Sequence, residues 1–205
     1  MRQAASRRPG SAAIRVAAAL LALAGQAAAE PLAVQVTDAA GRALEGAVVS
    51  VMVRGTRERA APGTTAEMTQ RDRAFQPGVL AVQTGTAVSF PNLDTVRHHV
   101  YSFSPIKPFE IKLYVGTPAA PVIFDKPGTA VLGCNIHDRM VGFIHVVDSP
   151  HFGRTDAAGA LALDVPAGEH QVRVWHPSLQ ATGAPLQSTV RVAAGSGGTL
   201  TMRLP

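Results

Sequence analysis

The sequence consists mainly of short segments in which apolar and polar residues alternate, and this pattern restricts the fold more than any other feature. L-A-V-Q-V-T (32–37), H-V-Y-S-F (99–103) and H-Q-V-R-V-W (170–175) are examples. Gly, Pro, Asp and Asn separate such segments, as they do at turns between strands. No stretch beyond residue 29 has the 3.6-residue period of an amphipathic helix. We therefore expect an all-β protein built from β-sandwiches.

The expected strands cover most of the chain after residue 31. Besides the three segments above, they are residues 47–53, two strands within 79–90 on either side of Gly85, and residues 109–114, 130–134, 141–147, 160–165, 188–192 and 199–204. The polar segment 56–65 shows no alternation, so it is predicted to be a linker.

Residues 1–29 have the composition of a secretory signal peptide. Four arginines precede or flank a short apolar run, A-A-A-L-L-A-L-A-G (17–25), and small residues at 27–29 favour cleavage after Ala29. The apolar run is too short to cross a bilayer, and no later segment is long and apolar enough. We expect an exported protein without a membrane span, located in a bacterial periplasm.

The charge of the mature chain argues against a nucleic-acid partner. The whole chain has 19 basic and 14 acidic residues, and four of the basic ones lie in the predicted signal peptide, which has no acidic residue. The mature chain is therefore close to neutral. Nucleic-acid-binding domains carry a clustered excess of positive charge instead.

One segment, G-C-N-I-H-D-R-M (133–140), carries the most reactive side chains. It contains Cys134, the only cysteine of the chain, followed by His137 and Met140. A single cysteine cannot form an internal disulfide, and in an oxidising compartment a free thiol is either buried or used. Thiolate, imidazole and thioether ligands suit a copper ion that cycles between Cu(I) and Cu(II). A trigonal site with two histidines and a cysteine needs one more histidine from a distant strand, and His98 is the candidate.

Other interpretations of these residues are weaker. Zinc favours cysteine, histidine and carboxylate ligands, so a methionine would be unusual in a zinc site. Catalysis by Cys134 with His137 would need an orienting Asp or Asn, and no recognisable motif supplies one. The remaining alternative is a buried cysteine that only packs in the core.

Residues 75–147 resemble the cupredoxins, the family of plastocyanin, pseudoazurin and amicyanin. F-Q-P-G-V-L-A-V-Q-T-G-T-A-V-S-F-P-N-L-D resembles the opening strands, H-H-V (98–100) the family's H-N-V, and M-V-G-F-I-H-V-V the last strand, which begins at the axial methionine. The C-x2-H-x2-M spacing is the short form seen in amicyanin. The resemblance implies one copper ion, with His98, Cys134 and His137 as equatorial ligands and Met140 as the axial ligand. It also implies an electron carrier rather than an enzyme.

The sequence departs from the cupredoxin pattern at two places. His99 stands where the family usually has an Asn that links the two ligand loops, so a histidine would have to supply that hydrogen bond. Asp138 and Arg139 fill the short loop where amicyanin-like proteins have a proline after the histidine. Strand alternation lets only one of His98 and His99 face inward, and alignment with the family selects His98.

The remaining histidines and the single tryptophan are assigned structural positions. His145 alternates with core residues of its strand, so it should point outward, to solvent or to the other domain. His151 and His170 are expected at the surface. Trp175 is expected to be a buried packing anchor.

The two segments that flank the cupredoxin-like region resemble the transthyretin-like sandwich of carboxypeptidase regulatory domains. Residues 32–53 resemble its first two strands, and residues 154–175 resemble later ones. The resemblance implies a discontinuous sandwich: a signal peptide at 1–29, a first part at 30–55, a cupredoxin domain at 66–148 and a second part at 150–205. Both flanks contain a D-A-A-G turn, so two modules in tandem are the alternative.

Together the resemblances imply a periplasmic blue copper protein that carries single electrons between redox proteins. Similar chains are labelled methylamine-utilisation or plastocyanin-like proteins, which suggests a dehydrogenase or a cytochrome as the partner. Val141, Phe143 and the loop 105–109 are the candidates for an apolar docking rim beside His137. One alternative is copper delivery or storage without rapid redox turnover. Another is a docking module that the copper domain only stabilises.

Overall fold

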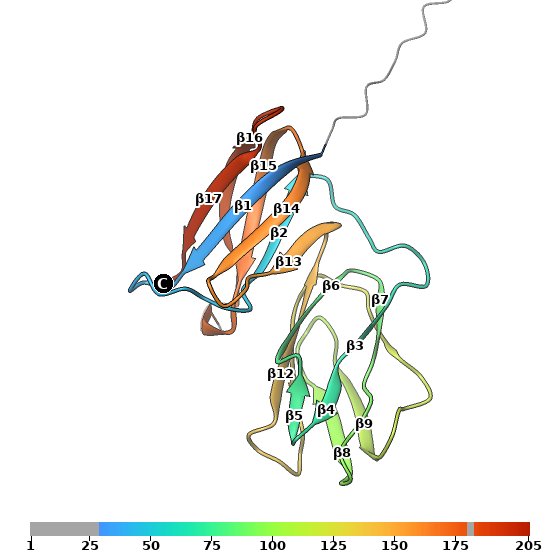
Figure 1. The fold of residues 1–205 in the computed structure, drawn as a ribbon. Coiled ribbons are helices and arrows are strands. Elements are labelled where there is room, and N and C mark those ends of the chain that lie inside the picture. The colour runs from blue at the N-terminus through green and yellow to red at the C-terminus, as the bar shows by residue number, and fades with distance from the viewer. Residues whose placement is uncertain (1–28, 180–182) are drawn as a thin grey trace, which may run out of the picture.

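The computed structural model describes residues 29–179 and 183–205, and the chain is almost entirely β within them. Two sandwiches make up the molecule (Figure 1). The terminal sandwich holds strands from both ends of the described chain, blue and red in Figure 1, and the middle sandwich holds the green to tan strands between them. The predicted all-β class is confirmed.

The terminal sandwich has two sheets, with strand orders β14-β1-β17 and β13-β2-β15-β16. One buried apolar cluster joins them and includes Val34 and Val51 from the first part of the chain and Val172 and Leu204 from the last. Its strands are β1 (Ala29–Thr37), β2 (Val48–Val53), β13 (His151–Arg154), β14 (Ala160–Pro166), β15 (Gly168–Trp175), β16 (Leu186–Val192) and β17 (Gly198–Arg203), and a 3-10 turn, η1 (Pro177–Leu179), follows β15.

Strand β1 lies between two strands from the end of the chain. It pairs antiparallel with β14 and parallel with β17. Its alternation buries Leu32, Val34 and Val36 in the cluster, as the sequence pattern predicts. The strands that pair with β1 are therefore more than 120 residues away in the sequence, as in the pairing of Val34 with Leu161.

The middle sandwich has a five-stranded sheet, β6-β12-β11-β8-β9, a three-stranded sheet, β10-β7-β3, and the hairpin β4-β5. Its own apolar cluster includes Phe90, Phe124, Leu132 and Ile144. The strands are β3 (Thr65–Glu67), β4 (Thr69–Arg71), β5 (Ala74–Gln76), β6 (Val79–Gln83), β7 (Thr86–Ser89), β8 (His98–Ser102), β9 (Phe109–Tyr114), β10 (Val122–Phe124), β11 (Gly128–Gly133) and β12 (Val141–Val147).

The predicted linker is fastened to the middle sandwich where β6 and β12 end. The Glu58 N–H donates to the Asp148 carbonyl oxygen at 2.7 Å, and the Ala60 N–H donates to the Thr84 carbonyl oxygen at 2.9 Å. These backbone hydrogen bonds fasten a segment that forms no strand before β3.

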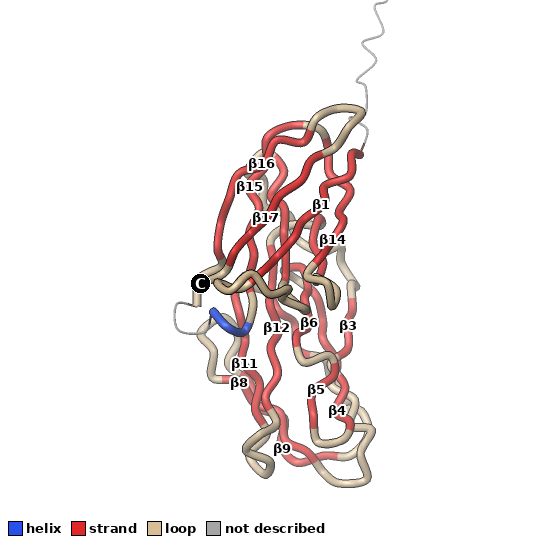
Figure 2. Tube along the Cα trace, turned by 60° about the vertical axis from the view of Figure 1, so that its left-hand side comes forward, coloured by secondary structure: helices blue, strands red, loops and turns tan. Residues whose placement is uncertain are grey.

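A third apolar cluster, the joint, lies where the two sandwiches meet and consists of Val48, Phe143, Val147 and Trp175. Strand β12 of the middle sandwich is followed along the chain by β13 of the terminal one (Figure 1). Figure 2 shows the two sandwiches end to end, with β1, β15 and β17 in one and β8, β9 and β11 in the other. The Trp175 ring stacks on His145 with centroids 4.8 Å apart and planes at 7°. His145 therefore points out of the middle sandwich toward the terminal one, and Trp175 is the predicted buried anchor.

One surface prediction is wrong. His170 is buried rather than exposed, and its Nε2–H donates to the Pro166 carbonyl oxygen at 2.6 Å. His170 is the third residue of β15, which is flanked on both sides by β2 and β16, so a polar residue there needs a local partner. His151 is half-buried at the start of β13.

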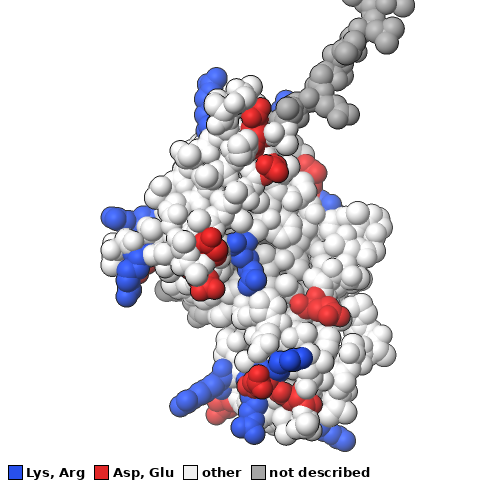
Figure 3. Space-filling view, in the orientation of Figure 1, with Lys and Arg blue, Asp and Glu red and all other residues white. Residues whose placement is uncertain are grey.

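No helix in the part of the chain that the structure describes is long and apolar enough to cross a membrane. Residues 1–28 of the predicted signal peptide lie outside the described residues. Its last residue, Ala29, is the first residue of β1. On the face shown in Figure 3, basic and acidic side chains are interspersed over both sandwiches.

Candidate metal centre

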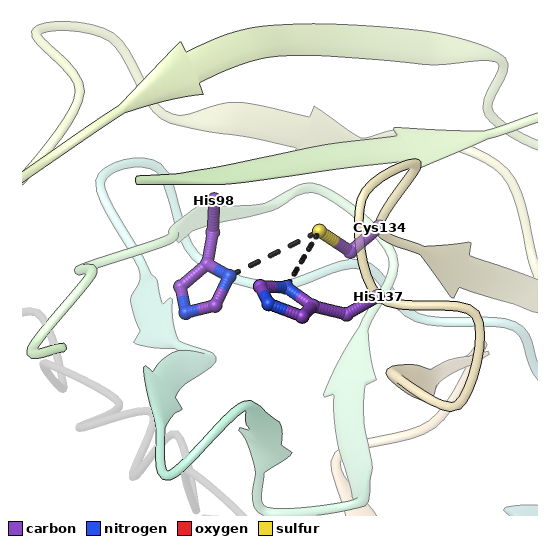
Figure 4. A group of neighbouring side chains, drawn as sticks. All are labelled: His98, Cys134 and His137. Atoms are coloured by element: carbon purple, nitrogen blue, oxygen red, sulfur yellow. Dashed lines mark hydrogen bonds between the residues drawn. The ribbon is translucent and has the colours of Figure 1, made fainter. Parts of the chain in front are cut away.

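Three of the predicted ligands come together at one end of the middle sandwich. The Sγ of Cys134 lies 3.9 Å from Nδ1 of His98 and 3.8 Å from Nδ1 of His137 (Figure 4). All three ligand atoms lie within 4.8 Å of one another. His98 and Cys134 are buried, whereas His137 is partly exposed. The cluster joins residues that are 36 positions apart in the sequence.

Two structural elements bring these side chains together. His98 is the first residue of β8, and Cys134 directly follows β11, whose last residue, Gly133, pairs with Tyr101 of β8. His137 lies in the turn between β11 and β12, which is closed by the Met140 N–H donating to the His137 carbonyl oxygen at 2.8 Å. The cluster thus lies near the first residues of β12, whereas the last residues of this strand lead to β13.

The two sulfur–nitrogen distances fit a trigonal metal ion. Metal–nitrogen bonds of ~2.0 Å and metal–sulfur bonds of ~2.3 Å, the values for zinc, would place sulfur and nitrogen ~3.7 Å apart at an angle of ~120°. The two observed Sγ–Nδ1 distances, 3.9 and 3.8 Å, are close to that value. A donor set of one thiolate and two imidazoles suits a copper ion, because sulfur favours Cu(I) and nitrogen accepts both oxidation states.

Met140 is buried in the same apolar cluster as Cys134. It directly precedes β12, as the resemblance to cupredoxins requires of an axial ligand. Its burial at 2 % exposure keeps the thioether away from solvent. The axial role itself remains a prediction.

The orientation of His98 is fixed by a carboxylate. Nε2 of His98 lies 2.7 Å from Oδ2 of Asp94, four residues earlier in the chain. A carboxylate oxygen accepts, so the proton of a neutral His98 is on Nε2 and the lone pair of Nδ1 faces Cys134. This is the tautomer that a metal ion at Nδ1 requires.

Asp94 is itself held by the tight turn of the β4-β5 hairpin. The Asp72 N–H donates to Oδ1 at 2.7 Å and the Arg73 N–H donates to Oδ2 at 3.0 Å. Burial acts to raise the pKa of Asp94, but the hydrogen bonds from the Arg73 amide, from His98 and from the Asp72 amide outweigh it, so this pKa lies below its usual range. The carboxylate is therefore ionised beside His98.

His99 is not part of the cluster. Its Nε2 pairs with Oε1 of Glu110 on β9 at 2.9 Å, and its ring packs against Tyr101 with centroids 5.5 Å apart. His98 and His99 thus have different partners although both are buried, which supports His98 as the histidine at the candidate site.

Asn92 fastens the loop before His98 in a way that the sequence analysis missed. Its Nδ2 donates to the carbonyl oxygens of Val96 and Tyr114, both at 2.9 Å, and its Oδ1 accepts from the Asp94 N–H at 3.0 Å. The Tyr114 hydroxyl donates to the Phe90 carbonyl oxygen at 2.7 Å, and burial raises the pKa of this phenol. The segment N-L-D (92–94) was visible in the sequence, but nothing in its spacing distinguishes it from an ordinary turn.

Two of the three candidates for the docking rim are wrong. Phe143 is buried at the joint, with its ring centroid 5.7 Å from that of Trp175. The loop 105–109 joins β8 at its far end, because Ser102 pairs with Phe109 while His98 pairs with Tyr114.

Exposed apolar residues lie on the segments that form the site. Val141 and Ile136 flank the His137 loop and are 48 % and 47 % exposed. Leu93 and Val115 are 51 % and 58 % exposed, and the pairing of Asn92 with Gly116 brings their segments together at the His98 end of the sandwich. Asp138 and Arg139 are exposed in the His137 loop.

No protein-family model and no curated protein sequence matches the chain. Solved structures do resemble parts of it. The copper-containing nitrite reductase from Thermus scotoductus SA-01 is 26 % identical with a TM-score of 0.38, covering 43 % of this chain, which spans only 25 % of the reductase. A reduced mutant of amicyanin is 16 % identical with a TM-score of 0.37 over 48 % of this chain and 97 % of its own.

A purple cupredoxin from Nitrosopumilus maritimus is 20 % identical with a TM-score of 0.35, over 40 % of this chain and 98 % of its own. All three TM-scores are low, and each likeness covers less than half of this chain. The functional proposal therefore rests on the residues of the site.

Proposed function

We propose that this protein is a periplasmic electron carrier with one type 1 copper ion, bound by His98, Cys134 and His137, with Met140 as a weak axial ligand. The observation that carries the proposal is the convergence of two imidazole nitrogens and one thiol sulfur within 4.8 Å. Bound copper would supply a one-electron couple between Cu(I) and Cu(II).

The surroundings of the ligands suit a centre that changes little when it gains or loses an electron. Cys134 lies in the apolar cluster with Phe90, Val100 and Leu132, so its thiolate is shielded from water. His98 is fully buried and fixed by Asp94. Ligands held by packing and hydrogen bonds before the metal binds keep their positions in both oxidation states.

His137 is the ligand through which electrons enter and leave under this proposal. It is the only partly exposed member of the three-residue cluster. Exposed Ile136, Val141, Leu93 and Val115 provide apolar surface on the same end of the sandwich. Exposed apolar side chains beside a partly exposed ligand suit a protein contact, so we expect a redox protein such as a dehydrogenase or a cytochrome to dock there.

The proposal is tested on the mature chain, residues 30–205, loaded with Cu(II). We expect an intense thiolate-to-copper absorption band in the visible region and a narrow copper hyperfine splitting in the EPR spectrum. Both should disappear in Cys134→Ser, which keeps the volume of the side chain and removes the sulfur. Fast electron self-exchange would then support the carrier.

Two results would overturn the proposal. A colourless protein that binds Cu(I) tightly and passes it to an acceptor would be a delivery or storage protein. A protein that binds no copper would leave Cys134 as a core residue.

A further inference from the structure

The contact between His98 and Asp94 connects the candidate metal centre to a hairpin that contributes no ligand. The His98 side chain is fully buried, and the Asp94 side chain is 14 % exposed. Oδ2 of Asp94 accepts from both His98 Nε2 and the Arg73 amide, and Oδ1 accepts from the Asp72 amide. The carboxylate thus has three donors, of which two belong to the β4-β5 turn.

The turn has a backbone conformation that suits this contact. Arg71 pairs with Ala74, so Asp72 and Arg73 form a two-residue turn. Their φ angles are 54° and 56°, as the commonest two-residue hairpin turn requires at both positions. A positive φ is unfavourable for arginine, and the hydrogen bonds of both turn amides to Asp94 offset that cost.

We propose that Asp94 is a positioning residue for the metal centre: held by the β4-β5 turn, it orients His98 Nδ1 toward the metal and its negative charge lowers the reduction potential. The inference rests on the proposed function, since it concerns the same site. The inference adds two features to the proposed site. One is Asp94, which is not a ligand, and the other is the β4-β5 turn, which holds Asp94 in place.

The direction of the effect follows from the charge on the ligand. A carboxylate that accepts the second ring N–H of a metal-bound histidine makes the imidazole a stronger base. A more basic nitrogen ligand stabilises Cu(II) more than Cu(I), because the doubly charged ion gains more from electron donation. Asp94 should therefore favour the oxidised state, and loss of its charge should favour the reduced state.

The main test is the reduction potential of the copper-loaded variant Asp94→Asn. The amide keeps the size of the side chain and removes its charge. We expect the Cu(II) affinity to fall at least tenfold relative to the Cu(I) affinity, which corresponds to a rise in potential of ~59 mV for a one-electron couple.

Glu110→Gln is the matched control. Glu110 accepts from the neighbouring histidine, His99, at 2.9 Å, so this variant also neutralises a carboxylate on a buried histidine of β8. Because His99 is not in the cluster, the potential of this variant should stay at the wild-type value. Equal potentials in wild type and Asp94→Asn, or equal shifts in the two variants, would overturn the inference.

A second measurement needs neither copper nor a variant. The nitrogen chemical shifts of His98 in the copper-free wild-type protein report which ring nitrogen carries the proton. We expect the proton on Nε2 near pH 8, and a proton on Nδ1 would show that Asp94 does not set the tautomer. If the wild-type protein lacks the thiolate-to-copper band, the proposed function is wrong. The tautomer of His98 would then be the test of whether Asp94 orients this ring.

Discussion

Neighbouring histidines in β8 have different roles because of the chemistry that surrounds each ring. His98 meets Cys134 and Asp94, and its two ring nitrogens have two partners of opposite kind. His99 meets Glu110 through Nε2, and its Nδ1 is one of the few buried polar atoms without a partner among the described residues. Of these two histidines, only His98 directs the lone pair of its Nδ1 at the Cys134 thiol.

Glutamine substitutions at the two positions separate these roles. We expect His98→Gln to abolish the thiolate-to-copper band, because an equatorial nitrogen is lost. The Cu(II) affinity should fall by at least ~tenfold. His99→Gln should keep the band, because the partners of His99 are Glu110 and Tyr101, and neither belongs to the cluster. Visible titration with Cu(II) measures both, and loss of the band in His99→Gln alone would reverse the assignment.

At the residue scale the sequence indicates the candidate ligands better than the residues that hold them in place. Cys134, His137 and Met140 are recognisable because three donor side chains stand three residues apart, and His98 through its H-H-V context. Asp94 gives no such signal, because an Asp four residues before a histidine is common in loops. Its role depends on the Asp72 and Arg73 amides, which reach it only through the folded hairpin.

Two D-A-A-G turns of the terminal sandwich have the same local structure but different surroundings. Oδ1 of Asp38 accepts from the amides of residues 40 and 42, and Oδ1 of Asp156 accepts from those of residues 158 and 160, all at 2.9 Å. Gly41 and Gly159 both have positive φ, 81° and 73°. A Cβ on Gly41 would approach only the Arg203 side chain, at 3.8 Å, whereas one on Gly159 would overlap the Val36 carbonyl oxygen.

Alanine substitutions at these glycines should therefore differ in cost. Gly41→Ala should lower the free energy of unfolding by ~1 to 2 kcal/mol, the cost of left-handed backbone for a residue with Cβ. Gly159→Ala adds the overlap with the backbone of β1 and should cost ~1 to 3 kcal/mol more. Urea unfolding followed by the fluorescence of Trp175 measures both. Equal losses would mean that β1 can move away from the turn.

At the element scale, the longer strands were predictable and the shortest were not. Strands such as β1 and β15 have nine and eight residues with clear alternation. Six strands of the described residues have only three or four residues, and five of them, β3, β4, β5, β10 and β13, were not predicted. A period of two cannot be recognised over so few positions, so these strands are defined by their hydrogen-bonded neighbours instead.

At the scale of the whole molecule, the arrangement depends on pairing between distant segments. Val34 of β1 pairs with Leu161 of β14 and Leu200 of β17, and the middle sandwich is formed by the residues between β2 and β13. Composition and alternation do not identify pairing partners, so only the resemblance of the flanks to one known module pointed to this arrangement. The joint was less predictable still, because Phe143 was expected at a docking rim and Trp175 as a buried anchor of its own strand, and nothing in the sequence pairs the two.

The joint should make the stability of the molecule depend on pH through His145. This side chain is buried between Thr129, whose Oγ1 lies 2.9 Å from its Nδ1, and the ring of Trp175. Burial lowers the pKa of His145 from 6.5 to about 4. The folded protein therefore keeps His145 neutral while the unfolded chain takes up a proton near its ordinary pKa.

It follows that the contribution of His145 to stability is complete above about pH 6.5 and is lost as the pH falls toward about 4. At about pH 4.5 the loss is ~2 to 3 kcal/mol. His145→Phe keeps a ring that can stack on Trp175 and removes the titrating group. Urea titrations at about pH 7.5 and about pH 4.5 measure the free energy of unfolding of both proteins. Between these pH values we expect the variant to lose ~2 kcal/mol less than wild type. Equal losses in the two proteins would show that His145 is accessible to protons in the folded state and that the joint opens without unfolding.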